Sequence, residues 1–364
     1  MHMTDEKIRV LIADDSLFMR RMLRQMLSGD SRIEVVDEAA DGVEAVAKCI
    51  SLSPDVLVLD VEMPKLDGIS VLKNIMNNRP LPVVMFSSLT QRGSQVTLEA
   101  LSMGAVDFVP KPASRDSVTS VASELCQKVI QASKARLRIG EPLRRHEKER
   151  AKRRKSSAGE ETLDSLVVIG SSTGGPQALE QIVSHLLPDL SCGIVICQHM
   201  PKGFTTSFAQ RLDSLSSLTV RESEQEDVLE PGVALVARGG YHLRLDSSII
   251  DGRQSFHVYL DEGTPVHGVR PSVDITLFDA VSLFGSNLMV VILTGMGFDG
   301  AKGAWAAKQK GATVICQDQE TSVVWGMPKA CYETGATDVL VPITGIASMI
   351  NEFGGHQSKR SFGR

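Results

Sequence analysis

Several polar side chains in the first part of the chain could do chemistry together, because each ends or follows a short apolar run. Asp14 and Asp15 follow the first run, Asp60 ends the second, Ser87 ends the third and Lys111 follows the fourth. If these runs are neighbouring parallel strands, their carboxyl ends open into one crevice and bring the side chains together. Clustered carboxylates suit a hard divalent cation such as Mg²⁺, which takes oxygen ligands.

A bound cation would allow one of these carboxylates to act as a nucleophile toward a phosphoryl group. We predict that Asp60 is this nucleophile, because it ends the presumed central strand. Asp15 would then be a metal ligand and Asp14 a supporting acid. Lys111 would neutralise charge on the phosphoryl oxygens, and Ser87 would donate a hydrogen bond to one of them. The alternative is that acids at strand ends only cap the following helices, which fits Asp14-Asp15 alone but not the ordered set of four strand ends.

Alternating strand and helix patterns over residues 8–135 predict the elements that position this site. Apolar runs typical of buried strands are followed by helical stretches five times. Five such units predict an α/β domain with a parallel sheet covered by helices on both faces, that is, a (βα)5 domain. The strands are expected near 8–13, 33–38, 56–60, 82–86 and 107–110, and the helices near 16–28, 42–51, 67–77, 92–104 and 116–135.

This part of the chain resembles a response-regulator receiver domain. The matching stretches are Val10-Leu11-Ile12-Ala13-Asp14-Asp15-Ser16, Leu59-Asp60-Val61-Glu62-Met63-Pro64 with Asp67-Gly68, Phe86-Ser87-Ser88, and Val109-Pro110-Lys111-Pro112. The resemblance implies phosphotransfer from a histidine kinase onto Asp60. It also implies an Mg²⁺ ion held by Asp14, Asp15, Asp60 and the backbone carbonyl of Glu62. Ser87 takes the position of the family's Ser/Thr switch residue, and Phe108 falls where receivers often carry a mobile aromatic side chain.

A hydroxyl that could act as a nucleophile follows an apolar run near the middle of the chain. Leu166-Val167-Val168-Ile169 leads into Gly170-Ser171-Ser172-Thr173-Gly174-Gly175-Pro176, and a helical pattern follows. The frame Gly-x-Ser172-x-Gly is that of a nucleophile elbow, in which glycines allow a sharp strand-to-helix turn. Backbone N–H groups at such a helix start can stabilise an oxyanion. A phosphate-cradling loop fits this segment equally well, and spacing alone does not choose firmly between Ser171 and Ser172.

A serine nucleophile needs a general base and an orienting acid, and both have candidates at strand ends. His199 and Asp299 each come after an apolar run that is typical of a buried strand. His242 and His267 lie in loop-rich segments and remain rivals for the base, while Asp299 could equally cap the next helix. The order Ser172, His199, Asp299 differs from the order Ser, acid, His of α/β-hydrolases. We therefore expect another doubly wound scaffold.

Strand and helix patterns resume after a basic, aperiodic segment, which predicts a second α/β domain. We expect a receiver domain over 1–135, a linker over 136–163, a catalytic domain over 164–354 and a tail over 355–364. The second domain is expected to be doubly wound and mostly parallel, and turn signals within 218–262 predict an insertion of β-hairpins. Its strands are expected near 166–170, 193–197, 288–293, 313–317 and 338–341, and its helices near 176–187, 203–213, 272–284, 298–310 and 343–353.

The second domain resembles the protein-glutamate methylesterase domain of bacterial chemotaxis. The matching stretches are Ile169-Gly170-Ser171-Ser172-Thr173-Gly174-Gly175-Pro176, Gln198-His199-Met200-Pro201-Lys202-Gly203-Phe204, Arg270-Pro271-Ser272-Val273-Asp274 and Leu293-Thr294-Gly295-Met296-Gly297-Phe298-Asp299-Gly300. The family pattern selects Ser172 as the nucleophile, His199 as the base and Asp299 as its orienter. It also implies that Thr173 lies beside the nucleophile and that the backbone of Met296 lies near the oxyanion.

Together the two resemblances cover nearly the whole chain and imply a chemotaxis methylesterase response regulator. Such an enzyme would hydrolyse glutamyl methyl esters on the cytoplasmic helices of methyl-accepting chemotaxis receptors, release methanol, and deamidate certain glutamines. A chemotaxis histidine kinase would be the phosphodonor. We expect the unphosphorylated receiver to block the mouth at Ser172, and phosphorylation to weaken that contact. One departure from the family is Arg238 in Ala237-Arg238-Gly239-Gly240, where proline is usual.

Composition and charge narrow the class of protein. Hydrophobic residues make up 42% and charged residues 23%, no run approaches a membrane span, and no leader is expected at the N-terminus. Six cysteines without Cys-x-x-Cys spacing favour free thiols in the cytoplasm, and we expect no cofactor in the catalytic domain. Residues 134–155 carry eleven Lys and Arg residues against three Glu residues. A solvated linker explains this run better than nucleic-acid binding, because no interleaved aromatics or DNA-binding motif accompany it.

Two other functions fit parts of the sequence. A response regulator whose second domain only binds a partner is the main alternative, and it should tolerate Ser172→Ala without functional loss. A small-molecule carboxylesterase is the other, and it would need a deep apolar pocket. The mouth rich in Gly, Ser and Thr is more typical of a site for a broad protein substrate.

Overall fold

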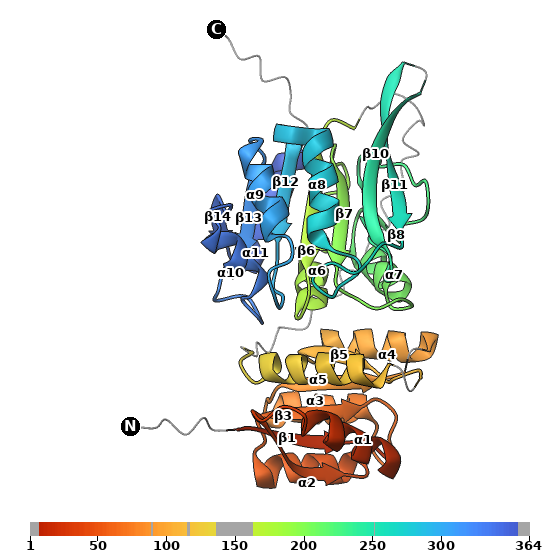
Figure 1. Ribbon diagram of the computed structural model, residues 1–364, viewed down its shortest axis with the longest axis vertical. Helices are drawn as coiled ribbons and strands as arrows, with labels where there is room; N and C mark the ends of the chain where they lie inside the picture. Colours follow the sequence, from red (N-terminus) through yellow and green to blue (C-terminus); the bar gives the residue numbers. More distant parts are fainter. Residues whose placement is uncertain (1–6, 89, 115–116, 136–162, 251, 356–364) are drawn as a thin grey trace. The chain divides into compact units, whose positions relative to one another are not determined.

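The computed structural model describes residues 7–88, 90–114, 117–135, 163–250 and 252–355 (Figure 1). The chain divides into two compact units, residues 1–141 and 142–364. Each unit has its own parallel sheet, in agreement with the predicted order of two α/β domains. The predicted limits of the linker and the tail fall on or next to residues outside the described ones, and they stay predictions.

The first unit alternates strands and helices as the (βα)5 pattern predicts. Its elements are β1 (Ile8–Ala13), α1 (Leu17–Leu27), β2 (Ile33–Ala39), α2 (Gly42–Leu52), β3 (Val56–Asp60), α3 (Gly68–Asn78), β4 (Val83–Ser87), α4 (Gln91–Ser102), β5 (Asp107–Pro110) and α5 (Val118–Ala132). The strands form a parallel sheet in the order β2-β1-β3-β4-β5, so β3 is central. Every residue of β3 and β4 is buried, and because alternate side chains point to opposite faces, helices must cover both faces.

Side-chain caps show which polar residues start helices in the first unit. The Ser16 hydroxyl accepts a backbone N–H in the first turn of α1 at 3.4 Å, and Asp67 accepts one at the start of α3 at 2.7 Å. Asp14 instead accepts the N–H of Ser16 at 2.9 Å. The cap of α1 is therefore Ser16, which leaves the acidic pair at the end of β1 free for another role.

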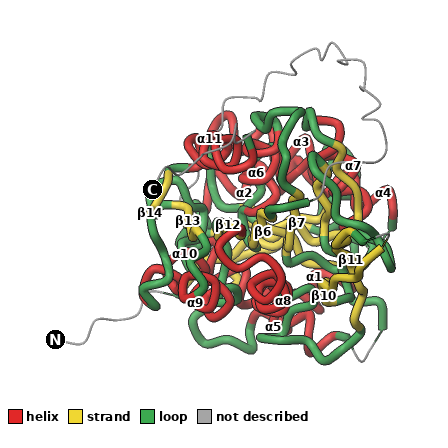
Figure 2. The backbone as a smooth tube through the Cα atoms, turned by 90° about the horizontal axis from the view of Figure 1, so that it is seen from above, coloured by secondary structure: helices red, strands yellow, loops and turns green. Residues whose placement is uncertain are grey.

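The second unit is built on a parallel sheet in the order β14-β13-β12-β6-β7-β9-β8. Its elements are β6 (Leu166–Ser171), α6 (Gly175–Val183), β7 (Gly193–Gln198), α7 (Thr205–Leu215), β8 (Thr219–Glu222), β9 (Val233–Val236), β10 (His242–Ile250), β11 (Arg253–Asp261), α8 (Val273–Phe284), η1 (Gly285–Asn287), β12 (Leu288–Ile292), α9 (Ala301–Gln309), β13 (Thr313–Gln317), α10 (Met327–Glu333), β14 (Val339–Val341) and α11 (Ile343–Gly354). Figure 2 shows β13, β12, β6 and β7 side by side, with α8 and α9 on one side and α6, α7 and α11 on the other. The unit is doubly wound, as predicted.

The segment 218–262 agrees only in part with the prediction of β-hairpins. β10 and β11 form an antiparallel hairpin in which Ile250 pairs with Arg253. β8 and β9, however, are parallel neighbours at one edge of the main sheet. Their connection leaves the sheet and pairs Val228 with His257 of β11 before it returns. Turn residues such as Pro231-Gly232 mark the end of a connection but do not specify the strand to which the chain returns, so the hairpin prediction was wrong there.

The interior of the second unit joins the sheet to the hairpin. Val168 of β6, Leu243 of β10, Phe256 of β11 and Leu277 of α8 belong to one buried cluster. Helix α10 was not predicted. Its seven residues make only about two turns, which is too short a segment for a helical repeat of apolar residues to be recognised. All six cysteines are buried free thiols. Within the described ranges, no helix is both long enough and apolar enough to cross a membrane.

Candidate functional site

Three adjacent strands of the second unit bring the predicted residues to one edge of the sheet. Ser172 directly follows β6, His199 directly follows β7, and Asp299 lies in the loop after β12. β12, β6 and β7 are parallel neighbours in the sheet. All three residues therefore leave the sheet at the carboxyl ends of its strands, where open α/β sheets bind ligands.

A tight turn holds Ser172 between β6 and α6. Gly174 adopts φ +77°, a left-handed conformation that favours glycine, and α6 begins at the next residue. The backbone N–H of Ser172 donates to the carbonyl of Thr294 at 3.1 Å, and the Ser172 carbonyl accepts the N–H of Gly175 at 2.8 Å. These bonds fix the Ser172 backbone, and the residue is only half-buried.

The two neighbouring serines differ in what their hydroxyls can do. Ser171 is fully buried, and its hydroxyl donates to Oε1 of Gln198 at 2.7 Å. The Nε2 group of Gln198 in turn donates to the carbonyls of Ser172 and His199, each at 3.0 Å. Because Ser171 serves this buried network, the structure favours Ser172 as the hydroxyl that can reach a ligand. The spacing of the sequence alone had left this choice open.

His199 and Asp299 form a close pair, as predicted for a base and its orienter. Nε2 of His199 lies 2.8 Å from Oδ2 of Asp299. The backbone N–H of His199 also donates to the carbonyl of Ser171 at 3.0 Å, which holds the base beside the nucleophile turn. With Nε2 on the carboxylate, Nδ1 is the ring nitrogen that is left to accept a proton.

The two rival histidines are engaged elsewhere. His242 is 2% exposed. Its Nδ1 accepts the N–H of Ser272 at 3.2 Å, and its Nε2 lies 3.0 Å from the carbonyl of Thr264. His267 lies 3.4 Å from Asp274 through its Nε2. Of the three candidates, His199 is the histidine that pairs with Asp299.

The carboxylate of Asp299 is held by the start of α8. Oδ2 accepts the N–H of Val273 at 2.7 Å, and Oδ1 accepts the Ser272 hydroxyl at 2.8 Å and the N–H groups of Asp274 and Gly300, each at 3.1 Å. Burial raises the pKa of Asp299, but the hydrogen bond and charge of His199 together with the backbone donors outweigh it and hold the pKa below its usual range. Asp299 is therefore an anion that orients its histidine.

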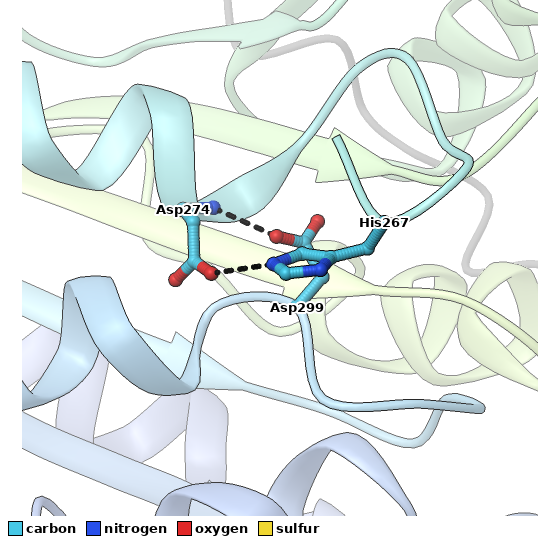
Figure 3. Close-up of side chains that lie close together, drawn as sticks. All are labelled: His267, Asp274 and Asp299. Carbon is cyan, nitrogen blue, oxygen red and sulfur yellow. Dashed lines mark hydrogen bonds and ion pairs between the residues drawn. The ribbon is translucent and has the colours of Figure 1, made fainter. Parts of the chain in front are cut away.

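A second acid, Asp274, lies beside Asp299, as Figure 3 shows. Asp274 is 2% exposed, and its Oδ1 accepts the N–H of Gly303 at 2.8 Å. Its Oδ2 faces Nε2 of His267 at 3.4 Å. Burial raises the pKa of Asp274, and the charge of Asp299 adds to this, against the Gly303 donor and His267. The ring of His267 meets Phe298 edge-on at 4.6 Å, so this pair supports the loop that carries Asp299.

The cluster of His267, Asp274 and Asp299 does not fit a metal ion well. One ligand atom from each residue lies within 4.8 Å of the others. However, the two oxygens of Asp299 already accept five donors, from His199, Ser272, Val273, Asp274 and Gly300. A carboxylate offers about four lone-pair positions, so a cation would have to displace bonds that hold the base in place.

The loop after β12 packs directly against Ser172. A Cβ atom on Gly295 would lie 2.8 Å from Cβ of Ser172, so only glycine fits this approach. Thr294 anchors the loop, because its hydroxyl donates to the carbonyl of Thr173 at 2.9 Å. Met296 follows Gly295 and is half-buried. Thr173, predicted to lie beside the nucleophile, and Met296, predicted to lie near the oxyanion, therefore belong to the two segments that meet at Ser172.

Sequence reasoning missed several polar residues that hold the site together. Gln198 and Gln317 are the last residues of β7 and β13, and both are almost fully buried. Oε1 of Gln317 accepts the N–H of Thr294 at 2.8 Å, so it fixes the start of the loop after β12. Both glutamines stand at strand ends, where the same rule that selected His199 could have found them.

In the first unit, the predicted phosphoryl-acceptor residues also come together. Asp60 ends the central strand and is 3% exposed, Asp14 is fully buried and Asp15 is exposed. Carboxylate oxygens of the three lie within 4.8 Å of one another. Nζ of Lys111 lies 2.9 Å from Oδ1 of Asp60 and 3.1 Å from Oδ2 of Asp14. Three carboxylates with one lysine form an oxygen-rich, negative cluster that fits a hard divalent cation.

Burial controls the titration of this cluster. Burial raises the pKa of Asp60 to about 6, and the charge of Asp14 adds to this, although the hydrogen bond and charge of Lys111 oppose it. Burial lowers the pKa of Lys111, but its bonds and charge interactions with Asp60 and Asp14 outweigh burial and raise the pKa above its usual value. Lys111 is therefore a permanent cation beside an aspartate whose ionisation is costly.

The remaining predicted residues of the first unit lie around this cluster. Ser87 is fully buried, and its Oγ lies 2.7 Å from the hydroxyl of Thr97 on α4. Phe108 is 2% exposed, with Nζ of Lys128 5.1 Å from its ring centroid. Glu62 is exposed and lines a pocket with Asp15, Met63 and Arg92. Ser87 thus connects the cluster to α4, while the aromatic ring is packed inside the fold.

Comparisons with known proteins cover both units. A family model described as CheB methylesterase matches residues 167–350, and a model of the response regulator receiver domain matches residues 10–123. A protein-glutamate methylesterase/protein-glutamine glutaminase of Symbiobacterium thermophilum is 45% identical over 354 residues, which covers 94% of this chain and 96% of the relative. A protein of the same name from Thermotoga maritima is also 45% identical, over 93% of this chain and 96% of the relative.

One solved structure is similar in sequence to about half of the chain. The crystal structure of the Thermotoga maritima CheB methylesterase catalytic domain is 46% identical, and the match covers 52% of this chain and 97% of that chain at a TM-score of 0.49. Both relatives match over nearly their whole length. The receiver model matches within the first unit, and the methylesterase model matches within the second. The chain therefore belongs to the CheB methylesterase family, with a response regulator receiver domain ahead of the methylesterase domain.

Proposed function

We propose that the chain is a protein-glutamate methylesterase and protein-glutamine glutaminase under the control of phosphorylation. Its substrates are glutamyl methyl esters, and certain glutamines, on the cytoplasmic helices of methyl-accepting chemotaxis receptors. The 2.8 Å pair of His199 and Asp299 beside the Ser172 turn carries this proposal. The names of the relatives support the choice of substrate. The enzyme acts in the cytoplasm, without insertion into a membrane and without binding nucleic acid.

Acyl transfer follows from the roles of three side chains. Oγ of Ser172 attacks the ester carbonyl carbon while Nδ1 of His199 takes the hydroxyl proton. The tetrahedral intermediate expels the methoxy group, which leaves as methanol with the proton from His199. Water then attacks the acyl-enzyme, His199 takes its proton and returns it to Ser172, and the glutamate carboxylate leaves. For a glutamine substrate, ammonia replaces methanol as the leaving group.

Asp299 and the backbone of Met296 stabilise charge during this reaction. The ionised Asp299 holds Nε2 of His199 and stabilises the imidazolium that forms at each proton transfer. The backbone of Met296 lies near the oxyanion, and Thr173 lies beside the nucleophile. The close packing of Gly295 on Ser172 supports this assignment. Loss of one oxyanion donor lowers the rate by a factor on the order of 10²–10³.

The receiver domain regulates this activity. A chemotaxis histidine kinase transfers a phosphoryl group to Asp60, which lies beside Lys111. Asp14, Asp15, Asp60 and the backbone carbonyl of Glu62 would hold Mg²⁺, which supplies positive charge to the phosphoryl oxygens when it is bound. Ser87 and Phe108 would change position in response to the new charge. Because Ser87 contacts Thr97 of α4, its movement would be transmitted to that helix.

Methanol release is the experiment that tests this proposal. We expect release from membranes that carry methylated receptors with the wild type, more of it with a small phosphodonor and Mg²⁺, and none with Ser172→Ala. Equal activity of Asp60→Asn and wild type, with and without the phosphodonor, would contradict the control by phosphorylation. Full biological function of Ser172→Ala would instead support a non-catalytic binding output domain.

A further inference from the structure

Two cations share one aromatic ring near His199. Nζ of Lys202 lies 5.6 Å and Cζ of Arg238 5.7 Å from the ring centroid of Tyr241, within the range of a cation–π interaction. Lys202 follows β7, and Arg238 follows β9. These two strands are parallel neighbours in the sheet, so both loops leave it at the edge where Ser172 lies.

Close packing fixes the two loops to each other. A Cβ atom on Gly239 would lie 2.6 Å from the carbonyl oxygen of Pro201, so a residue with a side chain would force the loops apart. The N–H of Gly239 also donates to the hydroxyl of Thr205 at 3.0 Å. Lys202 is three residues beyond the base His199. The cations are therefore held on two packed loops at the edge of the sheet where His199 also lies.

Little negative charge within the described residues balances these cations. Lys202 is exposed, and no described carboxylate lies within 4.0 Å of its Nζ. Arg238 meets Glu222 only at 3.9 Å, and the Glu222 oxygens accept the hydroxyls of Thr205 at 2.5 Å and Thr206 at 2.9 Å. Two positive groups at one ring repel each other, and an anion placed between them relieves that repulsion.

We propose that Lys202, Arg238 and Tyr241 form a docking surface, the cation rim, for carboxylates of the substrate polypeptide that flank the target ester. This inference rests on the proposed function and adds to it a preference for acidic segments. Arg238 presents a planar fork of donors to a carboxylate, Lys202 adds a mobile charge, and Tyr241 keeps both in place.

A pair of peptides tests the cation rim directly. Both are helical peptides with one glutamyl methyl ester, flanked by glutamates in the acidic peptide and by glutamines in the neutral one. We compare kcat/KM for methanol release by the full chain with phosphodonor and Mg²⁺. The wild type should prefer the acidic peptide by roughly three- to tenfold at low salt, and the preference should shrink as salt screens it. The double variant Lys202→Gln, Arg238→Gln should show a ratio near one.

A second double variant tests whether the preference comes from the cation rim or from the total charge of the protein. Lys310→Gln, Arg253→Gln removes two exposed cations from outside these loops and should keep the preference of the wild type. Three results would each overturn the inference but leave the proposed function intact. The wild type could show equal kcat/KM for both peptides, the preference could survive in Lys202→Gln, Arg238→Gln, or the preference could be lost in Lys310→Gln, Arg253→Gln. No methanol from either peptide with the wild type would overturn the proposed function, and the inference with it.

Discussion

Oδ2 of Asp299 accepts the backbone N–H of Val273 at 2.7 Å. Val273 is the first residue of α8, so the positive end of a helix supports the acid that orients His199. Backbone donors cannot rotate away as a side chain can, and this makes the position of the acid insensitive to its surroundings. The base is thus oriented by a carboxylate that a separate element holds in place.

Asp299→Asn should lower kcat for methanol release by roughly 10³–10⁴. The amide oxygen can still accept from Val273, but a neutral group does not stabilise the imidazolium of His199 and can hold it in the wrong tautomer. Activity measured beside the unfolding transition of the same sample separates this effect from misfolding. A variant with near wild-type kcat and an intact fold would show that the pair is structural only.

The lowered pKa of Asp299 also predicts how stability depends on pH. Because the folded-state pKa is below the ordinary value of 3.8, the ionised group contributes stability at higher pH. This contribution is lost as pH falls through the folded-state pKa. The free energy of unfolding of the wild type should therefore drop more steeply below about pH 4 than that of Asp299→Asn. Parallel curves from denaturant titrations between pH 2.5 and 6 would contradict the assignment.

The two adjacent serines should respond in opposite ways to removal of the hydroxyl. Ser172→Ala should abolish nearly all catalysis and leave the unfolding free energy almost unchanged, because its hydroxyl is needed only for attack. Ser171→Ala should cost about 1–3 kcal/mol of stability, because Oε1 of the buried Gln198 loses its donor. Methanol release and urea unfolding of both variants check this pair. Loss of activity only in Ser171→Ala would reverse the roles.

Asp274→Asn should change the pH dependence of stability in the direction opposite to Asp299→Asn. The pKa of Asp274 is raised, so the folded state keeps this proton to higher pH than the unfolded chain does. In the wild type, the free energy of unfolding should fall as pH rises from the ordinary pKa of 3.8 through the raised value, and the neutral variant should lack this fall. Urea unfolding at pH 4 and pH 7 measures the difference.

His267→Gln provides the control for that measurement. It removes the group that lies 3.4 Å from Oδ2 of Asp274, and so it should raise the pKa of Asp274 further. The fall in stability with rising pH should then extend to higher pH than in the wild type. If His267→Gln and the wild type gave the same profile, the contact between His267 and Asp274 would carry no charge interaction.

Mg²⁺ affinity of the first unit should depend on the ionisation of Asp60. Its pKa of about 6 means that a proton competes with the cation in weakly acidic solution. The apparent affinity measured by calorimetry on the full chain should fall about tenfold per pH unit below pH 6 and level off above it. Asp60→Asn should bind Mg²⁺ more weakly and lose this particular pH dependence. A flat profile in the wild type would show that Asp60 is ionised throughout or is not a ligand.

Much of the fold could be predicted because each buried parallel strand has a recognisable pattern in its own short stretch of sequence. Strands such as β3 and β6 are buried along their whole length, so apolar runs with polar ends locate them without any knowledge of their partners. The same pattern placed Asp60, Ser172 and His199 at strand ends. The parallel pairing of β8 with β9 has no such local pattern, because pairing is a contact between segments that are separated in the chain.

The sequence by itself determined the two α/β domains, the acidic cluster around Asp60 and the set of side chains from which a serine, a base and an acid could be drawn. Only the tertiary structure decided which of them meet. It assigned the Ser171 hydroxyl to Gln198, turned His242 and His267 to other partners, and set Asp299 against α8 rather than the helix that follows it. The physical reason is that hydrogen bonds need partners within about 3 Å, and such distances arise only when distant segments pack together.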